Sequence, residues 1–167
     1  MKTILSTLGV AALVLASCTT TKTYVIKGKS NTETQGTAKF TQKGKTVELD
    51  MNVYKLKSYG LHAAHIHENG DCSAADGSSA GGHWNPTQEK HGKWGHGEHH
   101  AGDLGNLKAD KDGVARMIMT TDKWCLGCKD EKKNIIGKSI IIHAKADDFK
   151  TQPTGDAGGR IGCVEIK

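Results

Sequence analysis

Apolar and polar residues alternate along several short stretches of this chain. The clearest stretch is residues 47–54, where Val47, Leu49, Met51 and Val53 alternate with more polar residues. Side chains of a strand point alternately to the two faces of a sheet, so this pattern predicts a strand with one buried and one solvated face. Similar stretches predict seven more strands, at residues 24–29, 36–42, 62–68, 104–108, 114–120, 138–144 and 160–166.

Eight short strands separated by turn signals predict an all-β domain, either an antiparallel sandwich or a barrel. Residues 69–102 form a long loop that is rich in glycine, serine, histidine and charge and has no periodicity, and residues 121–134 and 146–159 form two shorter loops. A loop as long as the first is uncommon in a compact domain and is usually functional or disordered. We expect metal ligands to organise it, because apolar burial cannot.

The composition agrees with this fold class and excludes some functions. The chain has 21 glycines, only two prolines and few long apolar runs, which argues against a helical bundle. Its formal net charge is +5, but the positive residues are scattered, without a basic block or an aromatic platform. Nucleic acid is therefore not expected as a partner, whereas a mildly positive surface suits a small anionic substrate.

The first 17 residues have the features of an export signal. A lysine is followed by an apolar stretch, residues 4–16, that ends in small residues and is too short to span a bilayer. The ending Leu15-Ala16-Ser17-Cys18 resembles the bacterial lipoprotein lipobox, in which the signal is cleaved before a cysteine that carries lipid. An ordinary secretory signal, with Cys18 incidental, is the alternative.

This N-terminus sets the expected domain organisation. We expect a lipoprotein signal peptide at residues 1–17, a lipidated tether at residues 18–22 and a single domain at residues 23–167. The protein would be exported and anchored through the lipid on Cys18 in the bacterial cell envelope, on the periplasmic side of a membrane. Exported proteins meet oxidising conditions, so the four remaining cysteines predict two disulfides, and the sequence alone allows three pairings. These cysteines are Cys72, Cys125, Cys128 and Cys163.

Histidines occur in five separate stretches, which argues against an unspecific histidine-rich tract. His65 and His67 are two apart in a predicted strand, so they share a face and can bind one metal, and His143 can join them from another strand. Imidazole suits both zinc and copper. The long loop adds donors for a second, tetrahedral site, and His83 is the candidate to give one ring nitrogen to each metal. The loop donors are His91, His100 and Asp103.

The motifs around these residues resemble those of copper/zinc superoxide dismutase. The first is GLHAAHIHE at residues 60–68, which contains the His-x-His pair. The others follow in the same order along nearly the whole mature chain: GGHWNP at 81–86, KHG at 90–92, HAGDLGN at 100–106, HAKADD at 143–148, and TGDAGGR at 154–160 followed by Cys163.

The resemblance implies a fold, a reaction and a role for each residue. The fold is an eight-stranded antiparallel Greek-key barrel with long metal-binding and electrostatic loops, and the reaction is dismutation of superoxide to oxygen and hydrogen peroxide. One copper ion would be held by His65, His67, His83 and His143, and one zinc ion by His83, His91, His100 and Asp103. Asp147 would hydrogen-bond a ligand of each metal, Arg160 would guide superoxide, Thr154 would line the channel, and Cys72 would pair with Cys163.

Several residues and functions stay open at this stage. Cys125 and Cys128 are outside the family pattern; a second disulfide is the expected role, and copper(I) collection the alternative. His62 is expected to be structural, and His96 and His99 to be solvated, with a role as alternative metal donors as the other interpretation. The competing functions are a non-catalytic module of the same fold that stores or delivers copper or zinc, and an envelope protein whose zinc only fastens the long loop. The sequence leaves a homodimer open.

Overall fold

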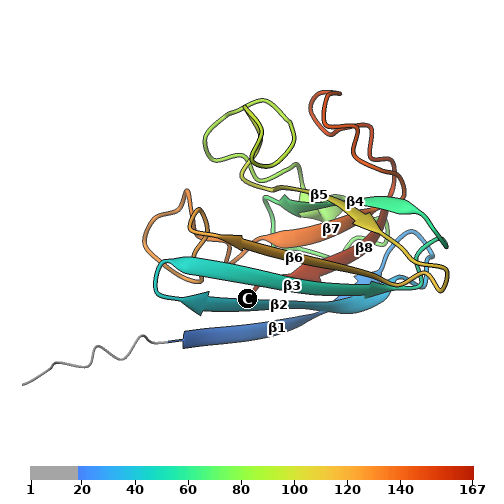
Figure 1. Ribbon diagram of the computed structural model, residues 1–167, viewed down its shortest axis with the longest axis horizontal. Coiled ribbons are helices and arrows are strands. Elements are labelled where there is room, and N and C mark those ends of the chain that lie inside the picture. The colour runs from blue at the N-terminus through green and yellow to red at the C-terminus, as the bar shows by residue number, and fades with distance from the viewer. Residues whose placement is uncertain (1–18) are drawn as a thin grey trace, which may run out of the picture.

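The computed structural model describes residues 19–167, so the expected signal peptide and Cys18 lie outside the described residues. Eight strands wrap around one core (Figure 1). Their bounds are β1 Thr19–Gly28, β2 Gln35–Lys43, β3 Thr46–Tyr54, β4 Leu61–His67, β5 Asp103–Lys108, β6 Ala115–Thr121, β7 Ser139–His143 and β8 Arg160–Glu165. Within the described residues, the only helical element is a 3-10 turn at Ser78–Ala80.

The strands form one antiparallel sheet in the order β5-β4-β7-β8-β1-β2-β3-β6. The two end strands, β5 and β6, contact each other, so the sheet closes into a nearly complete barrel. The connections from β3 to β4 and from β6 to β7 pass over neighbouring strands, which is the Greek-key pattern. The predicted all-β, eight-stranded antiparallel barrel is therefore confirmed.

The alternating residues fill the barrel. Val47, Leu49, Met51 and Val53 of β3 are all completely buried, and Phe40 of β2 packs in the same cluster. The intervening residues of β3 face solvent or are half-buried, as period-two alternation predicts. Burial of this apolar surface is the main force that stabilises the barrel, at about 25 cal/mol for each Å² removed from water.

Strand β7 is buried on both faces. Ile140 and Ile142 belong to the barrel core, whereas Ile141 packs outside it, against Ala80 and Cys163. The second, smaller cluster exists because the long loop covers the outer face of β7. A strand covered on both sides needs no polar face, which explains the unbroken apolar run that predicted a buried strand here.

Seven of the eight predicted strands match the observed bounds within one residue at each end, and β1 is the exception. It begins at Thr19 rather than at Tyr24, because residues 19–22 pair with Lys43 to Phe40 of β2. Residues 19–22, which were expected to belong to a lipidated tether at 18–22, are thus part of a barrel strand. Their threonines and lysine gave no apolar alternation, so the pairing was not visible in the sequence.

Two disulfides are present within residues 19–167. Cys72 pairs with Cys163, across 91 residues, and ties the long loop to β8. In a chain-entropy estimate, a crosslink over a loop of this length stabilises the fold by about 4–5 kcal/mol at most. Cys125 pairs with Cys128 within the loop between β6 and β7, as the structural interpretation of this pair predicted.

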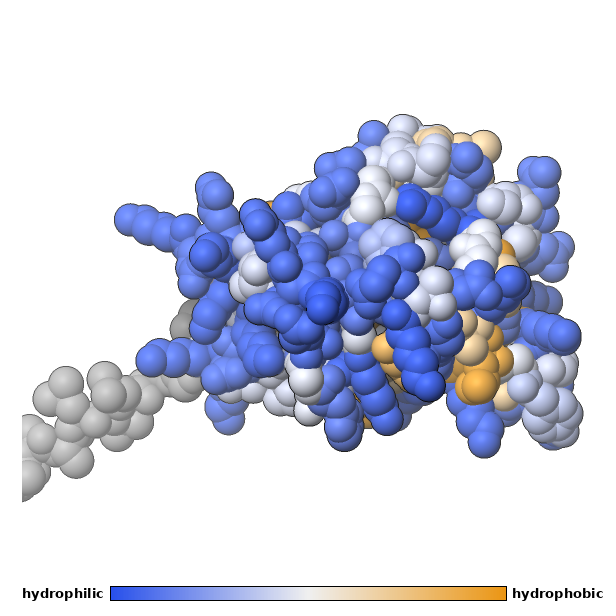
Figure 2. All heavy atoms as spheres, turned by 90° about the horizontal axis from the view of Figure 1, so that it is seen from above, coloured by the Kyte–Doolittle hydropathy of each residue, from blue (hydrophilic) through white to orange (hydrophobic). Residues whose placement is uncertain are grey.

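The described surface is mostly polar. The face seen in Figure 2 is predominantly hydrophilic, with small apolar areas between charged side chains. Large apolar side chains that are exposed are Val25, Tyr54, Tyr59, Leu61 and Ile118. Within residues 19–167, no helix has the length and apolar character that would be needed to cross a bilayer.

Replacing Phe40 by alanine tests the core. The side chain is fully buried, so Phe40→Ala should lower the free energy of unfolding by about 3–5 kcal/mol, which is typical of deleting a buried aromatic ring. The matched control is Ile118→Ala on β6, whose side chain is 54% exposed and should change stability by no more than about 0.5 kcal/mol. Urea denaturation of the metal-free protein measures both; equal losses would contradict the assignment of the core.

Candidate metal centre

Two neighbouring strands bring three histidines to the outside of the barrel. In β4, Ala64 and Ile66 belong to the core, so His65 and His67 point to the opposite face. Strand β7 pairs with β4 and carries His143 at its end. All three histidines are no more than 4% exposed, because the loops that rise from this side of the barrel cover them (Figure 1).

The long loop returns to the same place. His83 forms an isolated β-bridge with His67, and the backbone N–H of Trp84 donates a 2.8 Å hydrogen bond to the carbonyl of Ile66. This short backbone pairing fixes the loop beside β4. The later loop residues His91, His100 and Asp103 are also buried.

The first group of donors, here called the four-histidine set, consists of His65, His67, His83 and His143. Each offers one ring nitrogen, and these four nitrogens lie within 4.8 Å of one another. Nδ1 of His65 and Nε2 of the other three are buried and have no hydrogen-bond partner within the described residues. A buried polar atom without a partner costs about 1–3 kcal/mol, and a metal ion satisfies four such atoms at once.

Hydrogen bonds at the opposite ring nitrogens fix the orientation of three of these rings. His67 donates from Nδ1 to the carbonyl of Gly81 at 2.9 Å, and His143 donates from Nδ1 to the carbonyl of Gly158 at 3.2 Å. Nε2 of His65 donates to Asp147 at 2.8 Å. Because these nitrogens carry the protons, the lone pairs of the remaining nitrogens are free to bind a metal.

The second group, the mixed set, consists of His83, His91, His100 and Asp103. Nδ1 of His83 lies 3.0 Å from Oδ1 of Asp103 and 3.3 Å from Nδ1 of His100. Nδ1 of His91 lies 3.0 Å from Oδ2 of Asp103 but forms no hydrogen bond there. Tetrahedral zinc, with bonds of about 2.0–2.1 Å, holds its ligands about 3.3 Å apart. The donors of this set therefore have the chemistry and spacing of a closed zinc site.

His83 belongs to both sets. Its Nε2 is one of the unpartnered nitrogens of the four-histidine set, and its Nδ1 is among the donors of the mixed set. A five-membered ring with nitrogens on opposite sides can bind two metals at the same time. The structure thus brings together all seven metal-ligand candidates of the sequence, in the two groups that were expected.

Asp147 connects the two sets. Its Oδ2 accepts from Nε2 of His65 at 2.8 Å, and its Oδ1 accepts from Nε2 of His91 at 2.9 Å. His65, His91 and Asp147 could be taken for a third metal site by proximity alone. Their facing atoms are paired in hydrogen bonds, however, so this group orients one histidine of each set and is not expected to hold a metal of its own.

The pKa values of the donors follow from burial and from the carboxylates. Burial lowers the pKa of His67 to about 2, that of His83 to about 4 and that of His143 to about 3, so these rings are neutral near pH 7. Burial opposes the charged form of His91 as well, but the carboxylate of Asp103, 3.0 Å from Nδ1, and that of Asp147, which accepts from Nε2, raise its pKa to about 9. A metal bound at His91 would displace that proton.

Both carboxylates are ionised. Burial alone would raise the pKa of Asp103 and of Asp147, but hydrogen bonds from the histidines outweigh it and hold both pKa values well below the usual range. Neutral imidazoles and ionised carboxylates are the protonation states that bind metal ions. His67, His83, His143 and both carboxylates are therefore in the metal-binding state at neutral pH, whereas His91 has a proton to lose.

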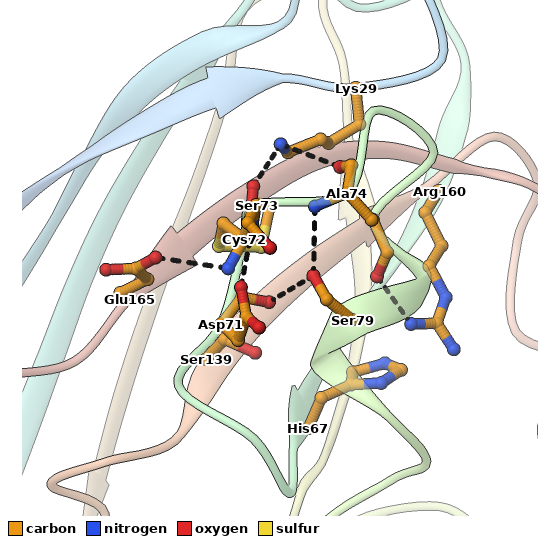
Figure 3. Close-up of a disulfide and its surroundings, with 12 residues drawn as sticks. Lys29, His67, Asp71, Cys72, Ser73, Ala74, Ser79, Ser139, Arg160 and Glu165 are labelled. Carbon is orange, nitrogen blue, oxygen red and sulfur yellow. Dashed lines mark hydrogen bonds between the residues drawn. A yellow bond between two sulfur atoms is a disulfide. The ribbon is translucent and has the colours of Figure 1, made fainter.

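Arg160 lies at the edge of the four-histidine set. Its two terminal nitrogens donate to the carbonyls of Gly77 and Gly81, each at 2.7 Å. The Gly81 carbonyl also accepts from His67, so one backbone group links the arginine to a metal-ligand candidate. Figure 3 shows the guanidinium group and the His67 ring on the same side of the loop. Burial lowers the pKa of Arg160, yet a guanidinium stays charged at neutral pH.

Sequence reasoning missed three residues that position the donors. The side chain of Gln152 bonds the backbone N–H and the carbonyl of His91, and that of Asn106 bonds both backbone groups of Asp147. Gly155 has a positive φ of 67°, and a Cβ there would lie 2.0 Å from Oδ1 of Asp147. Asn106 and Gly155 lie within the family motifs, so their positions could have indicated a role at the site. Gln152 lies outside these motifs, and no sequence pattern indicates its role.

The remaining predicted residues are placed as follows. Thr154 is exposed in the loop between β7 and β8. Nδ1 of the buried His62 donates to the carbonyl of His143 at 2.9 Å, as a structural histidine should. His96 is exposed, as expected, whereas His99 is half-buried and donates from Nδ1 to the carbonyl of His100 at 2.9 Å.

Comparison with known proteins identifies the family. The sequence model of copper/zinc superoxide dismutase (SODC) matches residues 34–166. The extracellular superoxide dismutase [Cu-Zn] of Caenorhabditis elegans is 37% identical over 155 residues, covering 87% of this chain and 67% of that protein. The superoxide dismutase [Cu-Zn] 1 of Aquifex aeolicus is 36% identical over 136 residues, covering 79% of each.

A second kind of relative is also similar. The superoxide dismutase-like protein YojM of Bacillus subtilis is 44% identical over 120 residues, covering 70% of this chain and 61% of that protein. The crystal structure of a SOD-like protein from Bacillus subtilis superposes with a TM-score of 0.77 at 32% identity, covering 87% of this chain and 97% of that chain. The chain therefore belongs to the copper/zinc superoxide dismutase family, as its motifs indicated, and its cofactors are copper and zinc.

Proposed function

We propose that this enzyme dismutates superoxide at a copper ion that shares His83 with a zinc ion, and that it does so in the cell envelope. The observation that carries the proposal is the convergence of four unpartnered, buried imidazole nitrogens, one of which belongs to a ring whose other nitrogen lies in a second set of four donors. Such an arrangement suits two adjacent ions of different chemistry.

The donor sets determine which metal each would hold. Copper would be held by the four-histidine set, because an all-imidazole site suits a copper ion. Zinc would be held by the mixed set, which provides four protein donors at tetrahedral spacing. Copper, when bound, supplies the one-electron exchange that oxidises one superoxide to oxygen and reduces the next to hydrogen peroxide, whereas zinc keeps a single oxidation state.

The chain's own residues attract the substrate and handle a proton. The guanidinium of Arg160 is charged and fixed beside His67, so it would attract superoxide to the edge of the four-histidine set. Formation of hydrogen peroxide consumes two protons, and Nε2 of His83 can hold one of them when it is not bound to a metal. Asp147 would keep His65 and His91 in their binding orientation. The exposed Thr154 would line the approach to the site.

A non-catalytic module that stores or delivers copper or zinc is the second candidate. The similarity to a protein that is named only as superoxide dismutase-like favours it. The complete four-histidine set and the fixed Arg160 of this chain favour the enzyme instead, because storage requires no anion-attracting group beside the metal. Superoxide consumption by the copper-loaded protein distinguishes the two functions.

The location in the envelope rests on the lipobox-like ending at Cys18 and on relatives that are named as extracellular enzymes. If Cys18 carries lipid, the barrel lies directly at the membrane surface, because β1 begins at the next residue. Metabolic labelling with a fatty acid, compared between the natural chain and Cys18→Ser, tests this location.

The oligomeric state is a separate question, and a homodimer stays a prediction.

Replacement of single histidines tests the shared ligand. His83→Ala should weaken copper and zinc binding together, each by at least about tenfold, and His67→Ala should weaken copper binding alone. The control is His96→Ala, whose ring is exposed and lies in neither set. Metal content after dialysis against a chelator, with a superoxide-consumption assay, gives the result. One copper and one zinc are expected in the unaltered protein; zinc loss on His67→Ala equal to that on His83→Ala would contradict the assignment.

Replacement of Asp147 tests the link between the sets. Oδ1 accepts two hydrogen bonds, from His91 and from the backbone of Phe149, whereas Oδ2 accepts one, from His65. In Asp147→Asn the amide oxygen should keep the place with two donors, so the amide nitrogen faces His65. We therefore expect copper affinity to fall about 10–100-fold and zinc affinity to fall less.

Competition with chelators measures both affinities in this experiment. The matched control is Asp148→Asn, which removes one carboxylate charge at the next residue, where the side chain is exposed and bonds only to Lys150 and Thr151. It should leave both affinities unchanged. A larger loss of zinc than of copper in Asp147→Asn would show that the amide is oriented the other way and that the argument is wrong.

A further inference from the structure

The position of the Arg160 guanidinium depends on a loop. Both carbonyls that hold it, those of Gly77 and Gly81, belong to the segment 71–81 of the long loop. The disulfide from Cys72 to Cys163 fixes one end of this segment to β8. Near its other end, the N–H of Asn69 donates to the carbonyl of Ala80 at 3.0 Å, and Ala80 packs against Ile141 of β7. Between these attachments, the contacts of residues 72–77 help to determine where the two carbonyls lie.

Lys29 provides such contacts. It follows β1 directly, and its amino group donates to the carbonyl of Cys72 and, at 3.0 Å, to the carbonyl of Ala74 (Figure 3). The side chain is half-buried and takes part in none of the ion pairs formed within residues 19–167. Its charge is therefore directed at two loop carbonyls, and charge-assisted hydrogen bonds are stronger than neutral ones.

Lys29 lies close to the glycine that binds Arg160, and the next residue, Ser30, bonds Arg160 itself. A Cβ added to Gly77 would lie 3.4 Å from the Arg160 side chain and 3.6 Å from Cγ of Lys29, so both side chains lie close to this glycine. Ser30 donates from Oγ to the backbone carbonyl of Arg160 and from its N–H to the carbonyl of Ala75, both at 2.8 Å. The turn after β1 thus holds the arginine and the loop that binds it.

We propose that Lys29 is a positioning residue for Arg160. By holding the carbonyls of Cys72 and Ala74, its ammonium group sets the conformation of the segment 71–81 and so places the carbonyls of Gly77 and Gly81 that aim the guanidinium. The inference rests on the proposed function, in which Arg160 attracts superoxide. A small anion is recognised through the direction of the guanidinium, so a displaced arginine should bind anions less well.

The experiment must separate positioning from simple loss of a positive charge. Lys29→Met keeps most of the aliphatic stem and removes the ammonium group. Lys27→Met is the matched control, since it removes one charge two residues earlier, from an exposed side chain that makes no hydrogen bond within the described residues. Long-range attraction is screened at 1 M salt, where the Debye length is about 3 Å, whereas a displaced arginine is not restored by salt.

Three quantities are measured. Two of them use the copper- and zinc-loaded proteins: kcat/KM for superoxide at low and high salt, and the dissociation constant of azide at copper(II) by absorption spectroscopy. The third uses the metal-free proteins and is the rate of amide hydrogen exchange at Ala80 and Gly81. We expect Lys27→Met to lower kcat/KM only at low salt. Lys29→Met should lower it by about threefold to tenfold at both salt concentrations, weaken azide binding by a similar factor and speed exchange.

Lys29→Arg should restore all three quantities, because its fork of N–H groups can reach the same carbonyls. Equal behaviour of Lys29→Met and Lys27→Met at high salt, or unchanged azide binding in Lys29→Met, would overturn the proposal. If Lys29→Met does not fold, Lys29→Gln takes its place with the same expected and opposing results. Absence of turnover in the unaltered, copper-loaded protein would overturn the proposed function instead, while azide binding and hydrogen exchange still decide the role of Lys29.

Discussion

Burial of imidazole nitrogens without hydrogen-bond partners is the constraint on which this structure depends. The loops bury His65, His67, His83 and His143, and one nitrogen of each ring has no hydrogen-bond partner within the described residues. A metal ion shared among the four would satisfy all of these nitrogens, and the same loops bring the mixed set to the other side of His83. The barrel supplies the base of the site, and the long loop is held to it by a few buried apolar residues such as Ala80 and Trp84, while its buried donors would bind the metals.

The strands could be predicted from the sequence because their stabilising contacts are periodic. Alternation in β3 and the apolar run of β7 each report directly which faces are buried. The exception is β1, where residues 19–22 pair through backbone groups and carry no apolar alternation. Backbone hydrogen bonds hold such a strand regardless of its side chains, and therefore the sequence pattern showed only its second half.

The metal donors could also be predicted, since strand alternation and family motifs both indicate them. The residues that position the donors are harder to find, because each contacts a partner from a distant part of the chain. Gln152 bonds the backbone of His91 and Lys29 bonds the backbone carbonyls of Cys72 and Ala74. A hydrogen bond to a backbone group can be made whatever residue carries that group. The sequence therefore contains no complementary side chain that would indicate the contact.

The central claim is that one imidazole, that of His83, joins two metal ions. Its most direct test is electron paramagnetic resonance of the protein with copper(II) placed in both donor sets. Two copper(II) ions joined through one imidazolate should be magnetically coupled, so we expect strong loss of the ordinary copper(II) signal, and its recovery when zinc replaces copper in the mixed set. Two independent, uncoupled copper(II) signals would contradict it.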